Sequence, residues 1–260
     1  MCLILLAWQA HPEFPLVVAA NRDEFFARPT VSGQFWNDSP NILAGRDLSA
    51  GGTWMGVTRN GRFAALTNFR DLEHHRAEAL SRGRLVSDFL SGKTTPVDFL
   101  NDVAQRASAY NDFNLICGTL QGHDYDLWYF SNRSEAANVP RQLTPGIYGL
   151  SNHLLDTPWP KVVQKKSELT AALSALPQEA LLFDLLRDER IHEDERLPRT
   201  GVSLEWERIL SAAFVRSQDY GTRSSTVLLQ DRNGFVSFDE QTFLLGAKPG
   251  NRSRFRFRLL

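Results

Sequence analysis

The first twenty residues contain two short runs made only of apolar residues, and these runs limit the folds open to the chain. Residues Cys2 to Trp8 and 16–20 are apolar at odd and even positions alike, and the segment 11–15 between them carries two prolines. Because successive side chains of a strand point to opposite faces, such strands must be covered on both faces. The pattern predicts a β-hairpin buried between two layers.

Three further hairpins are predicted along the chain. Two of them turn at an Asn-Gly pair, which suits the type I′ turn of a tight hairpin. The three pair residues 53–58 with 62–68, residues 113–120 with 126–131, and residues 226–230 with 235–238. Shorter strand segments lie around Ile42, Ile147 and Phe255. Together these segments indicate antiparallel sheets.

Helical periodicity occurs between the hairpins. Thr95 is a predicted N-cap with Pro96 at the first helical position, and apolar residues then recur at helical spacing. Other predicted helices span residues 84–90, 160–173, 178–186 and 204–214, with a tight connection over 45–52 and an exposed charged loop over 187–199. Hairpins on either side of a helical middle predict an α+β fold. We expect one domain spanning residues 1–260.

Composition excludes several classes of protein. Apolar residues make up 42% and charged residues 23% of the chain, as in globular proteins. The net charge of −1 gives no global attraction to nucleic acid or to an anionic membrane. The longest clean apolar run, 3–8, is far shorter than the roughly 20 residues of a membrane span, and no secretory signal is evident. We expect a soluble, cytoplasmic protein without a nucleic-acid partner.

Motifs for common cofactors are absent from the sequence. There is no dinucleotide fingerprint, no phosphate loop and no zinc-protease motif. His74 and His75 are adjacent and have no cysteine or acidic cluster at ligand spacing, so a solvated loop is predicted there rather than a metal site. His153 suits either a pocket or the surface. No metal is predicted.

Cys2 is the residue that most favours catalysis. Removal of Met1 would leave a chain that begins with cysteine, so one residue would carry a thiol and an α-amine. An amine with a pKa of roughly 7.7–8.0 can act as general base toward its own thiol. The alternative is a small buried strand residue, which is the prediction for Cys117.

Four polar residues, Asn21-Arg22-Asp23-Glu24, follow the second apolar run. A short hairpin brings the end of its second strand beside the start of its first. Asp23 is therefore expected near the amine of Cys2, where a carboxylate can orient the ammonium group. The alternative is a solvated turn with a weak ion pair.

Cys2 and the segment 19–29, Ala-Ala-Asn-Arg-Asp-Glu-Phe-Phe-Ala-Arg-Pro, resemble the NRDE family, also called the transport and Golgi organisation 2 family. The segments 44–47, 51–56, 65–70, 149–152 and 224–227 agree with it. The resemblance extends from Met1 to about Phe243. That family is in turn similar to the N-terminal-nucleophile (Ntn) hydrolases, especially the bile-salt and penicillin V amidases. The implied fold is a four-layer αββα sandwich, with two antiparallel sheets between helices.

The resemblance also implies roles for single residues. Cys2 matches the nucleophile, and Asp23 matches the carboxylate near its amine. Asn68 and Asn152 match the two asparagines beside the oxyanion, where removing one donor typically costs about 3 kcal/mol. Arg223 matches an arginine that precedes a late strand.

One position departs from the amidase pattern. The amidases carry an arginine three residues before the aspartate, where this chain has Ala20. Arg22 shares the parity of Ala20, so it reaches the same face if the strand continues.

Three functions follow from the resemblance. The first is an amidase or thioesterase that acts on an acyl substrate and needs no cofactor for hydrolysis. The second is a non-catalytic carrier of haem or acyl-CoA, and the third is a factor in secretory trafficking or Golgi organisation. Five aromatic residues suit either pocket lining or core packing: Trp36, Trp54, Trp128, Trp159 and Phe26.

Overall fold

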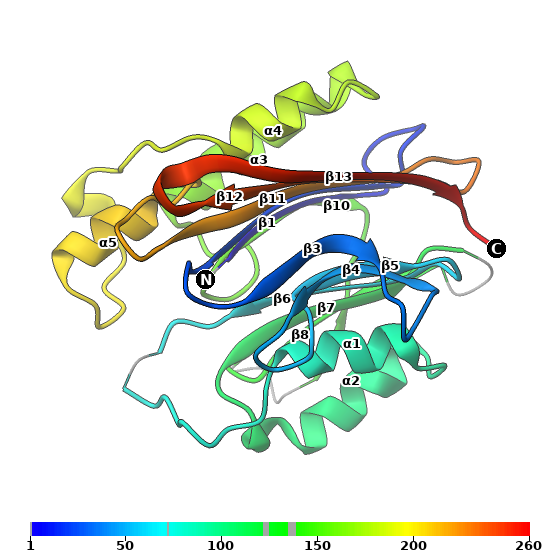
Figure 1. The fold of residues 1–260 in the computed structure, drawn as a ribbon, viewed down its shortest axis with the longest axis horizontal. Helices are drawn as coiled ribbons and strands as arrows, with labels where there is room; N and C mark the ends of the chain where they lie inside the picture. Colours follow the sequence, from blue (N-terminus) through cyan, green and yellow to red (C-terminus); the bar gives the residue numbers. More distant parts are fainter. Residues whose placement is uncertain (1, 72, 122–124, 135–138) are drawn as a thin grey trace.

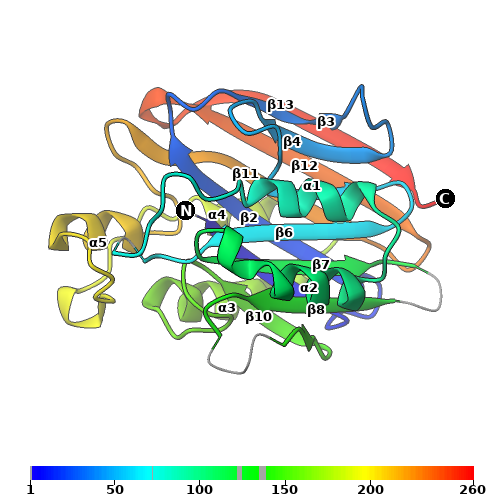
Figure 2. The same cartoon turned by 90° about the horizontal axis from the view of Figure 1, so that it is seen from below.

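Two antiparallel sheets lie face to face, and helices cover their outer sides (Figures 1 and 2). The computed structural model describes residues 2–71, 73–121, 125–134 and 139–260. The predicted α+β fold with αββα layers is confirmed. No helix among the described residues is long and apolar enough to cross a membrane.

The first sheet, sheet A, has the strand order β10-β1-β2-β11-β12-β13. Its strands are β1 (Cys2–Trp8), β2 (Leu16–Phe25), β10 (Gly146–Leu150), β11 (Tyr220–Gln230), β12 (Phe235–Leu244) and β13 (Lys248–Arg258). The predicted first hairpin is confirmed, with Cys2 opposite Arg22. The strand β2 continues past Ala20 through the polar motif, because β1 pairs with it on one side and β11 on the other.

The second sheet, sheet B, has the strand order β3-β4-β5-β6-β7-β8-β9. Its strands are β3 (Thr30–Phe35), β4 (Ile42–Asp47), β5 (Met55–Thr58), β6 (Arg62–Asn68), β7 (Phe113–Thr119), β8 (Asp126–Ser131) and β9 (Arg141–Gln142). The tight connection predicted over 45–52 is wrong at its start, because β4 runs to Asp47. Gly45 lies against the ring of Trp54 where a β-carbon would overlap it, so this glycine allows close packing within a strand.

The helices form the outer layers. On sheet B lie α1 (Gly83–Ser91) and α2 (Pro96–Gln105), and on sheet A lie α3 (Pro160–Ala172) and α4 (Ala180–Leu186). The predicted N-cap is confirmed, since the side chain of Thr95 accepts a hydrogen bond from the backbone N–H of Asp98. Near one end of sheet A lies α5 (Leu204–Ser211), which ends before the predicted residue 214 because Ala212 takes an extended conformation (Figure 1).

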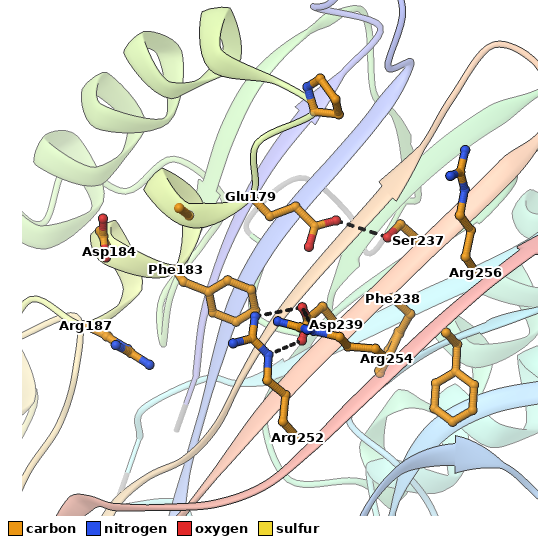
Figure 3. Close-up of a pocket in the computed structure, with 13 residues that line it drawn as sticks. Glu179, Phe183, Asp184, Arg187, Ser237, Phe238, Asp239, Arg252, Arg254 and Arg256 are labelled. Carbon is orange, nitrogen blue, oxygen red and sulfur yellow. Dashed lines mark hydrogen bonds and ion pairs between the residues drawn. The ribbon is translucent and has the colours of Figure 1, made fainter.

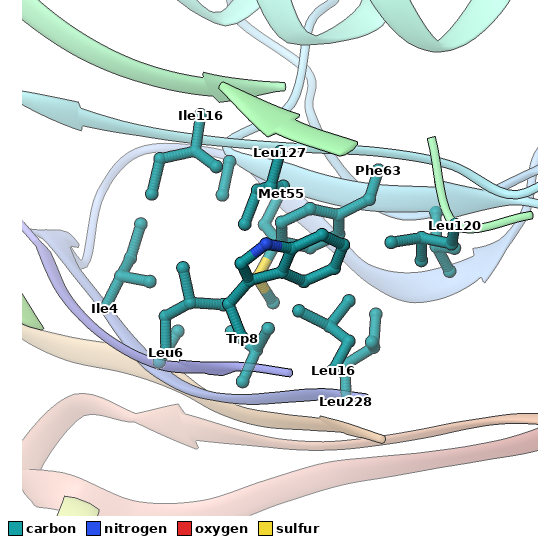
Figure 4. Packing of buried hydrophobic residues seen from close by; sticks show 14 of the residues in the cluster. Ile4, Leu6, Trp8, Leu16, Met55, Phe63, Ile116, Leu120, Leu127 and Leu228 are labelled. Carbon is teal, nitrogen blue, oxygen red and sulfur yellow. The ribbon is translucent and has the colours of Figure 1, made fainter. Parts of the chain in front are cut away.

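The two-sided apolar pattern of β1 is explained by the core. Ile4, Leu6 and Trp8 pack between the sheets, with Met55 and Phe63 of sheet B among their neighbours (Figure 4). The odd-numbered residues of β1 pack instead beneath the helices of the sheet A side. The same alternation continues along β2, and it sends neighbouring residues of the polar motif to different layers.

Candidate functional site

Four of the six predicted site residues line a single cleft. Cys2, Arg22, Asp23 and Asn68 border a space of about 290 Å³ that residues of both sheets line. The other lining residues are Glu24, Arg28, Asp47, Ala50, Thr53, Trp54, Leu66, Ala79, Leu80, Ser81, Arg82, Gly83 and Asn111. We call this space the Cys2 cleft. Its lining is rich in charged and polar groups.

The thiol of Cys2 is nearly enclosed, because the residue is only 9% exposed. Burial raises the pKa of the thiol, and the carboxylate of Asp23 raises it further. The guanidinium group of Arg22 lowers this pKa, but burial dominates. The predicted α-amine of Cys2 depends on Met1, which lies outside the described residues.

Asp23 is buried at the end of the β1–β2 pair. Its Oδ1 accepts a hydrogen bond of 2.7 Å from the hydroxyl of Thr222, and its carbonyl accepts one of 3.0 Å from the hydroxyl of Tyr220. Burial raises the pKa of the carboxyl, whereas the cations of Lys161 and Arg70 lower it. Asp23 is therefore a buried, hydrogen-bonded carboxylate whose charge affects the pKa of the Cys2 thiol, and the cations of Lys161 and Arg70 lie near it.

Those two cations, Lys161 and Arg70, are buried, and the sequence analysis did not predict them as part of the site. The Nζ of Lys161 donates to the carbonyls of Leu210 at 2.7 Å and Ala212 at 3.4 Å, and Arg70 pairs with Glu207 at 3.0 Å. Burial lowers the pKa of Lys161 to about 8. A signal for Lys161 was present, since helical spacing puts it in line with the buried residues of α3.

Arg22 lies on the same face of β2 as Ala20, between the sheets. Its guanidinium carbon is 4.3 Å from the centre of the Trp54 ring, and its Nη1 donates to the hydroxyl of Thr30 at 3.3 Å. Because β2 continues beyond Ala20, the departure from the amidase pattern leaves an arginine on this face.

The two predicted oxyanion residues differ in position. Asn68, at the end of β6, lines the Cys2 cleft, whereas Asn152 is fully buried and does not line it. The Nδ2 of Asn152 donates to the carbonyl of Asn68 at 2.9 Å. Beside it, the hydroxyl of Ser151 donates to the carbonyl of Cys2 at 3.2 Å. Asn152 therefore lies outside the cleft lining and holds the backbone of Asn68 through this hydrogen bond.

Arg223 also lies outside the cleft lining. Its Nη1 donates to the carbonyls of Phe25 at 2.7 Å, Phe26 at 3.2 Å and Arg28 at 3.1 Å. These contacts hold the turn that follows β2. Arg28 from that turn lines the cleft and pairs with Asp47 at 2.6 Å. Arg223 thus acts on the cleft through this turn.

Another residue missed by the sequence analysis is Arg82, just before α1. It lines the cleft, and its Nη1 donates to the carbonyl of Asp112 at 2.9 Å. Burial lowers its pKa, and Glu24 is the acidic group that most counters this. Arg82 belongs to no local motif. It reaches the Cys2 cleft through the course of the chain between β6 and α1, which the sequence alone does not show.

The other predicted candidates have packing roles. Of the five aromatic residues, only Trp54 lines the Cys2 cleft. His153 lies between the rings of Phe69 and Trp159, outside that cleft. Cys117 is buried in the core between sheet B and its helices, as predicted. Within the described ranges, no three His, Cys, Asp or Glu residues gather in a metal-binding arrangement.

Comparison with known proteins connects this geometry to a family. The family model described as Transport and Golgi organisation 2 matches residues 1–244. The chain belongs to this family. Its resemblance to the Transport and Golgi organization 2 homolog of Mus musculus covers 94% of both chains at 37% identity. The Transport and Golgi organization protein 2 homolog of Bos taurus is 38% identical over 96% of this chain and 95% of its own.

A solved structure resembles the whole chain. It is a Cys-to-Ala mutant of the conjugated bile acid hydrolase from Clostridium perfringens, with a TM-score of 0.50. The match covers 100% of this chain and 92% of that one at 9% sequence identity. At that identity the likeness shows the fold alone, which is of the Ntn-hydrolase type.

Proposed function

We propose that this chain is a cysteine N-terminal-nucleophile hydrolase that cleaves a small acyl amide or thioester in the Cys2 cleft after Met1 is removed. The observation that carries the proposal is that Cys2, Asp23 and Asn68, from three strands and both sheets, line one cleft. The hairpin of β1 and β2 brings Asp23 to Cys2, but Asn68 comes from the other sheet, so its place in the same cleft does not follow from the hairpin.

The residues have separate roles in the proposed reaction. The sulfur of Cys2 attacks the acyl carbon, and the thiol proton passes to the α-amine of the same residue. Asp23 orients the resulting ammonium group. The amide of Asn68 donates to the oxyanion of the tetrahedral intermediate, and Asn152 holds Asn68 in place.

Collapse of the intermediate completes the first half of the reaction. The carbon–nitrogen or carbon–sulfur bond of the substrate breaks, and the leaving group takes the proton from the ammonium. A thioester of Cys2 remains. Water then attacks this thioester and gives a proton to the α-amine, and the carboxylic acid leaves as the thiol is restored.

The size and lining of the cleft support a small, polar acyl substrate. Its volume of about 290 Å³ lies at the lower end of ligand sites, and Arg22, Arg28 and Arg82 line it. These arginines are suited to hold a carboxylate or another anionic group of the substrate.

The test is hydrolysis by protein whose loss of Met1 has been verified by intact mass. Short N-acyl amides and acyl thioesters are supplied, and the released acid is measured by mass spectrometry. Cys2→Ala is expected to abolish turnover and Cys2→Ser to leave a trace, because a hydroxyl is much harder to deprotonate. Cys117→Ala removes the other cysteine, which does not line the cleft, and should retain turnover. Equal rates for wild type and Cys2→Ala would contradict the proposal.

A second candidate is non-catalytic binding of a hydrophobic ligand, haem or acyl-CoA. The raised pKa of the buried Cys2 thiol favours it, since the thiolate is the reacting species. In that case both Cys2 variants should bind haem or acyl-CoA as the wild type does, and no variant should hydrolyse the acyl panel. The names of the mouse and cattle relatives support a third candidate, a factor in transport and Golgi organisation.

A further inference from the structure

The last strand of sheet A carries an unusual separation of charge. The whole chain has 29 basic and 30 acidic residues, yet residues 248–258 contain five basic residues and no acidic one. Four of the five are arginines at alternating positions: Arg252, Arg254, Arg256 and Arg258. Alternation puts them on one face of β13.

That face is the outer side of sheet A. Phe255 and Phe257, at the intervening positions, pack against the core between the two sheets, so the arginines point the opposite way. In the described part of the chain, α4 packs on β2 and β11, and β13 lies beyond it at the edge of the sheet (Figure 1). The arginine face is therefore open on one side and walled by α4 on the other.

A groove of about 720 Å³ separates β12 and β13 from α4 (Figure 3). Arg252, Arg254 and Arg256 line it from the strand side, and Arg187 lines it from the end of α4. We call this space the arginine groove. Its volume lies in the range of small-molecule sites, and the Cys2 cleft shares none of its lining residues.

A buried carboxylate holds two of the arginines in fixed orientations. Asp239, only 4% exposed, accepts from Nε and Nη2 of Arg252 at 2.8 Å each and from Nε of Arg254 at 2.9 Å (Figure 3). The guanidinium of Arg252 also lies 4.9 Å from the centre of the Phe183 ring. A guanidinium fixed in this way loses little freedom when it binds a ligand, and further N–H groups of both arginines have no hydrogen bond to a described residue.

The charged residues that line the groove are four arginines and three acidic residues, Glu179, Asp184 and Asp239, so positive charge is in excess by one. The side chains of Arg187 and Arg256 make no ion pair with any described residue. Glu179 on the opposite wall accepts from the hydroxyl of Ser237 at 3.0 Å. Burial raises the pKa of Glu179, and nearby Asp239 raises it further, so it holds its negative charge less firmly than an ordinary glutamate.

We propose that the arginine groove is a binding site for a phosphate-bearing organic ligand, separate from the Cys2 cleft. Arg252 and Arg254, oriented by Asp239, supply paired N–H donors of the kind that phosphate oxygens accept. Arg187 and Arg256 supply additional positive charge. The rings of Phe183 and Pro177 provide apolar surface for the organic part of the ligand.

The test uses two probes that distinguish a free ligand from a lipid headgroup. Inorganic tripolyphosphate is titrated into the full chain by calorimetry at low salt. In parallel, the chain is sedimented with phosphatidylcholine vesicles that contain phosphatidylinositol bisphosphate. Binding to tripolyphosphate alone assigns a free ligand, and binding to both probes assigns a headgroup as a source as well. Binding to neither probe would overturn the proposal.

Three variants separate a built site from general attraction. Arg254→Gln with Arg256→Gln should weaken binding by about tenfold or more. Arg84→Gln removes one positive charge at an exposed position of α1, against two in the double variant, and should change binding less than about twofold. An equal loss in this control would overturn the proposal.

Asp239→Asn gives the sharpest contrast. It makes the groove more positive, so general attraction predicts tighter binding. It also releases Arg252 and Arg254, so an oriented site predicts weaker binding, and tighter binding would overturn the proposal. Near-ultraviolet circular dichroism checks that the variant is folded, and the arginine variants decide the matter if it is not. Cys2→Ala should bind as the wild type does, whatever the outcome for hydrolysis.

Discussion

Replacing Asn21 with alanine tests whether the polar motif on β2 stabilises the fold as well as forming the cleft. Asn21 is 1% exposed and lies on the helix side of sheet A. Its Nδ2 donates to the carbonyls of Leu186 and Ala213 at 2.8 Å each. Its Oδ1 accepts from the hydroxyl of Ser225 at 2.6 Å. One side chain therefore ties the end of α4 and the segment after α5 to the sheet.

The expected loss of stability follows from these three bonds. A buried hydrogen bond between neutral groups contributes about 1 kcal/mol, and a buried polar group left without a partner costs about 1–3 kcal/mol. Alanine removes all three bonds and leaves two carbonyls and one hydroxyl without this partner. We expect Asn21→Ala to lower the free energy of unfolding by about 3–5 kcal/mol. Ser225→Ala removes one bond and should cost about 1 kcal/mol.

Equilibrium unfolding in urea, followed by circular dichroism and tryptophan fluorescence, measures both values. Coincidence of the two signals and an unchanged dependence on urea would show that the same transition is compared. If Asn21→Ala loses less than about 1 kcal/mol, water replaces the amide at little cost, and the reasoning is refuted.

Three further predictions concern groups near the cleft. Lys161 has a pKa of about 8 in the folded chain against an ordinary 10.5, so between these pH values the unfolded chain binds more protons and stability rises with pH. The free energy of unfolding of the wild type relative to Lys161→Met should increase by about 3 kcal/mol over that range in urea titrations, and a constant difference would contradict this. Glu207→Gln leaves the buried guanidinium of Arg70 without its carboxylate and should cost about 3 kcal/mol by the same assay; a loss below about 1 kcal/mol would argue against a tightly buried pair. Gly45→Ala places a β-carbon where the Trp54 ring lies, so it should lower the free energy of unfolding by about 2 kcal/mol and shift the tryptophan emission. An unchanged spectrum and an unchanged stability would show that the ring moves freely.

The hairpins were predictable because their information is local. The apolar run from Cys2 to Trp8 predicts burial on both faces of the strand, and the Asn-Gly pair correctly marks a turn. The turn is not the predicted type I′, because Gly61 has a positive φ of 75° but Asn60 does not have a positive φ. The edge strand β3 was not predicted, because its residues Thr30–Phe35 include few apolar ones and it forms only through its pairing with β4.

Helical spacing places Lys161 on the buried side of α3, but its hydrogen bonds and the end of α5 were not predictable, for a common reason. The carbonyls of Leu210 and Ala212 accept hydrogen bonds from Lys161, which lies about 50 positions earlier in the chain. The sequence around Lys161 and the sequence around Leu210 and Ala212 give no sign of these hydrogen bonds. Of the residues that line the cleft, Asn68 was predicted from the resemblance and Asp23 from the hairpin. Arg82 was not predicted, because it lies in a loop whose course cannot be read from a local sequence pattern.

Because side chains alternate along β2, its polar motif is divided between two layers of the fold. An irregularity in β11 lets residues of that strand bond to the two motif residues that face the helices. Asn21 and Asp23 face the helices, whereas Arg22 faces Trp54 between the sheets. Ser225 and Thr222 bond to Asn21 and Asp23 although they are three positions apart, which a regular strand would turn to opposite faces. The register of β11 against β2 shifts between Thr222 and Ser224, so the extra residue, Arg223, restores the face of Thr222. That extra residue is free of the ladder and reaches the turn after β2. The bulge thus supplies both the hydroxyl that holds Asp23 and the arginine that fixes the turn carrying Arg28 into the cleft.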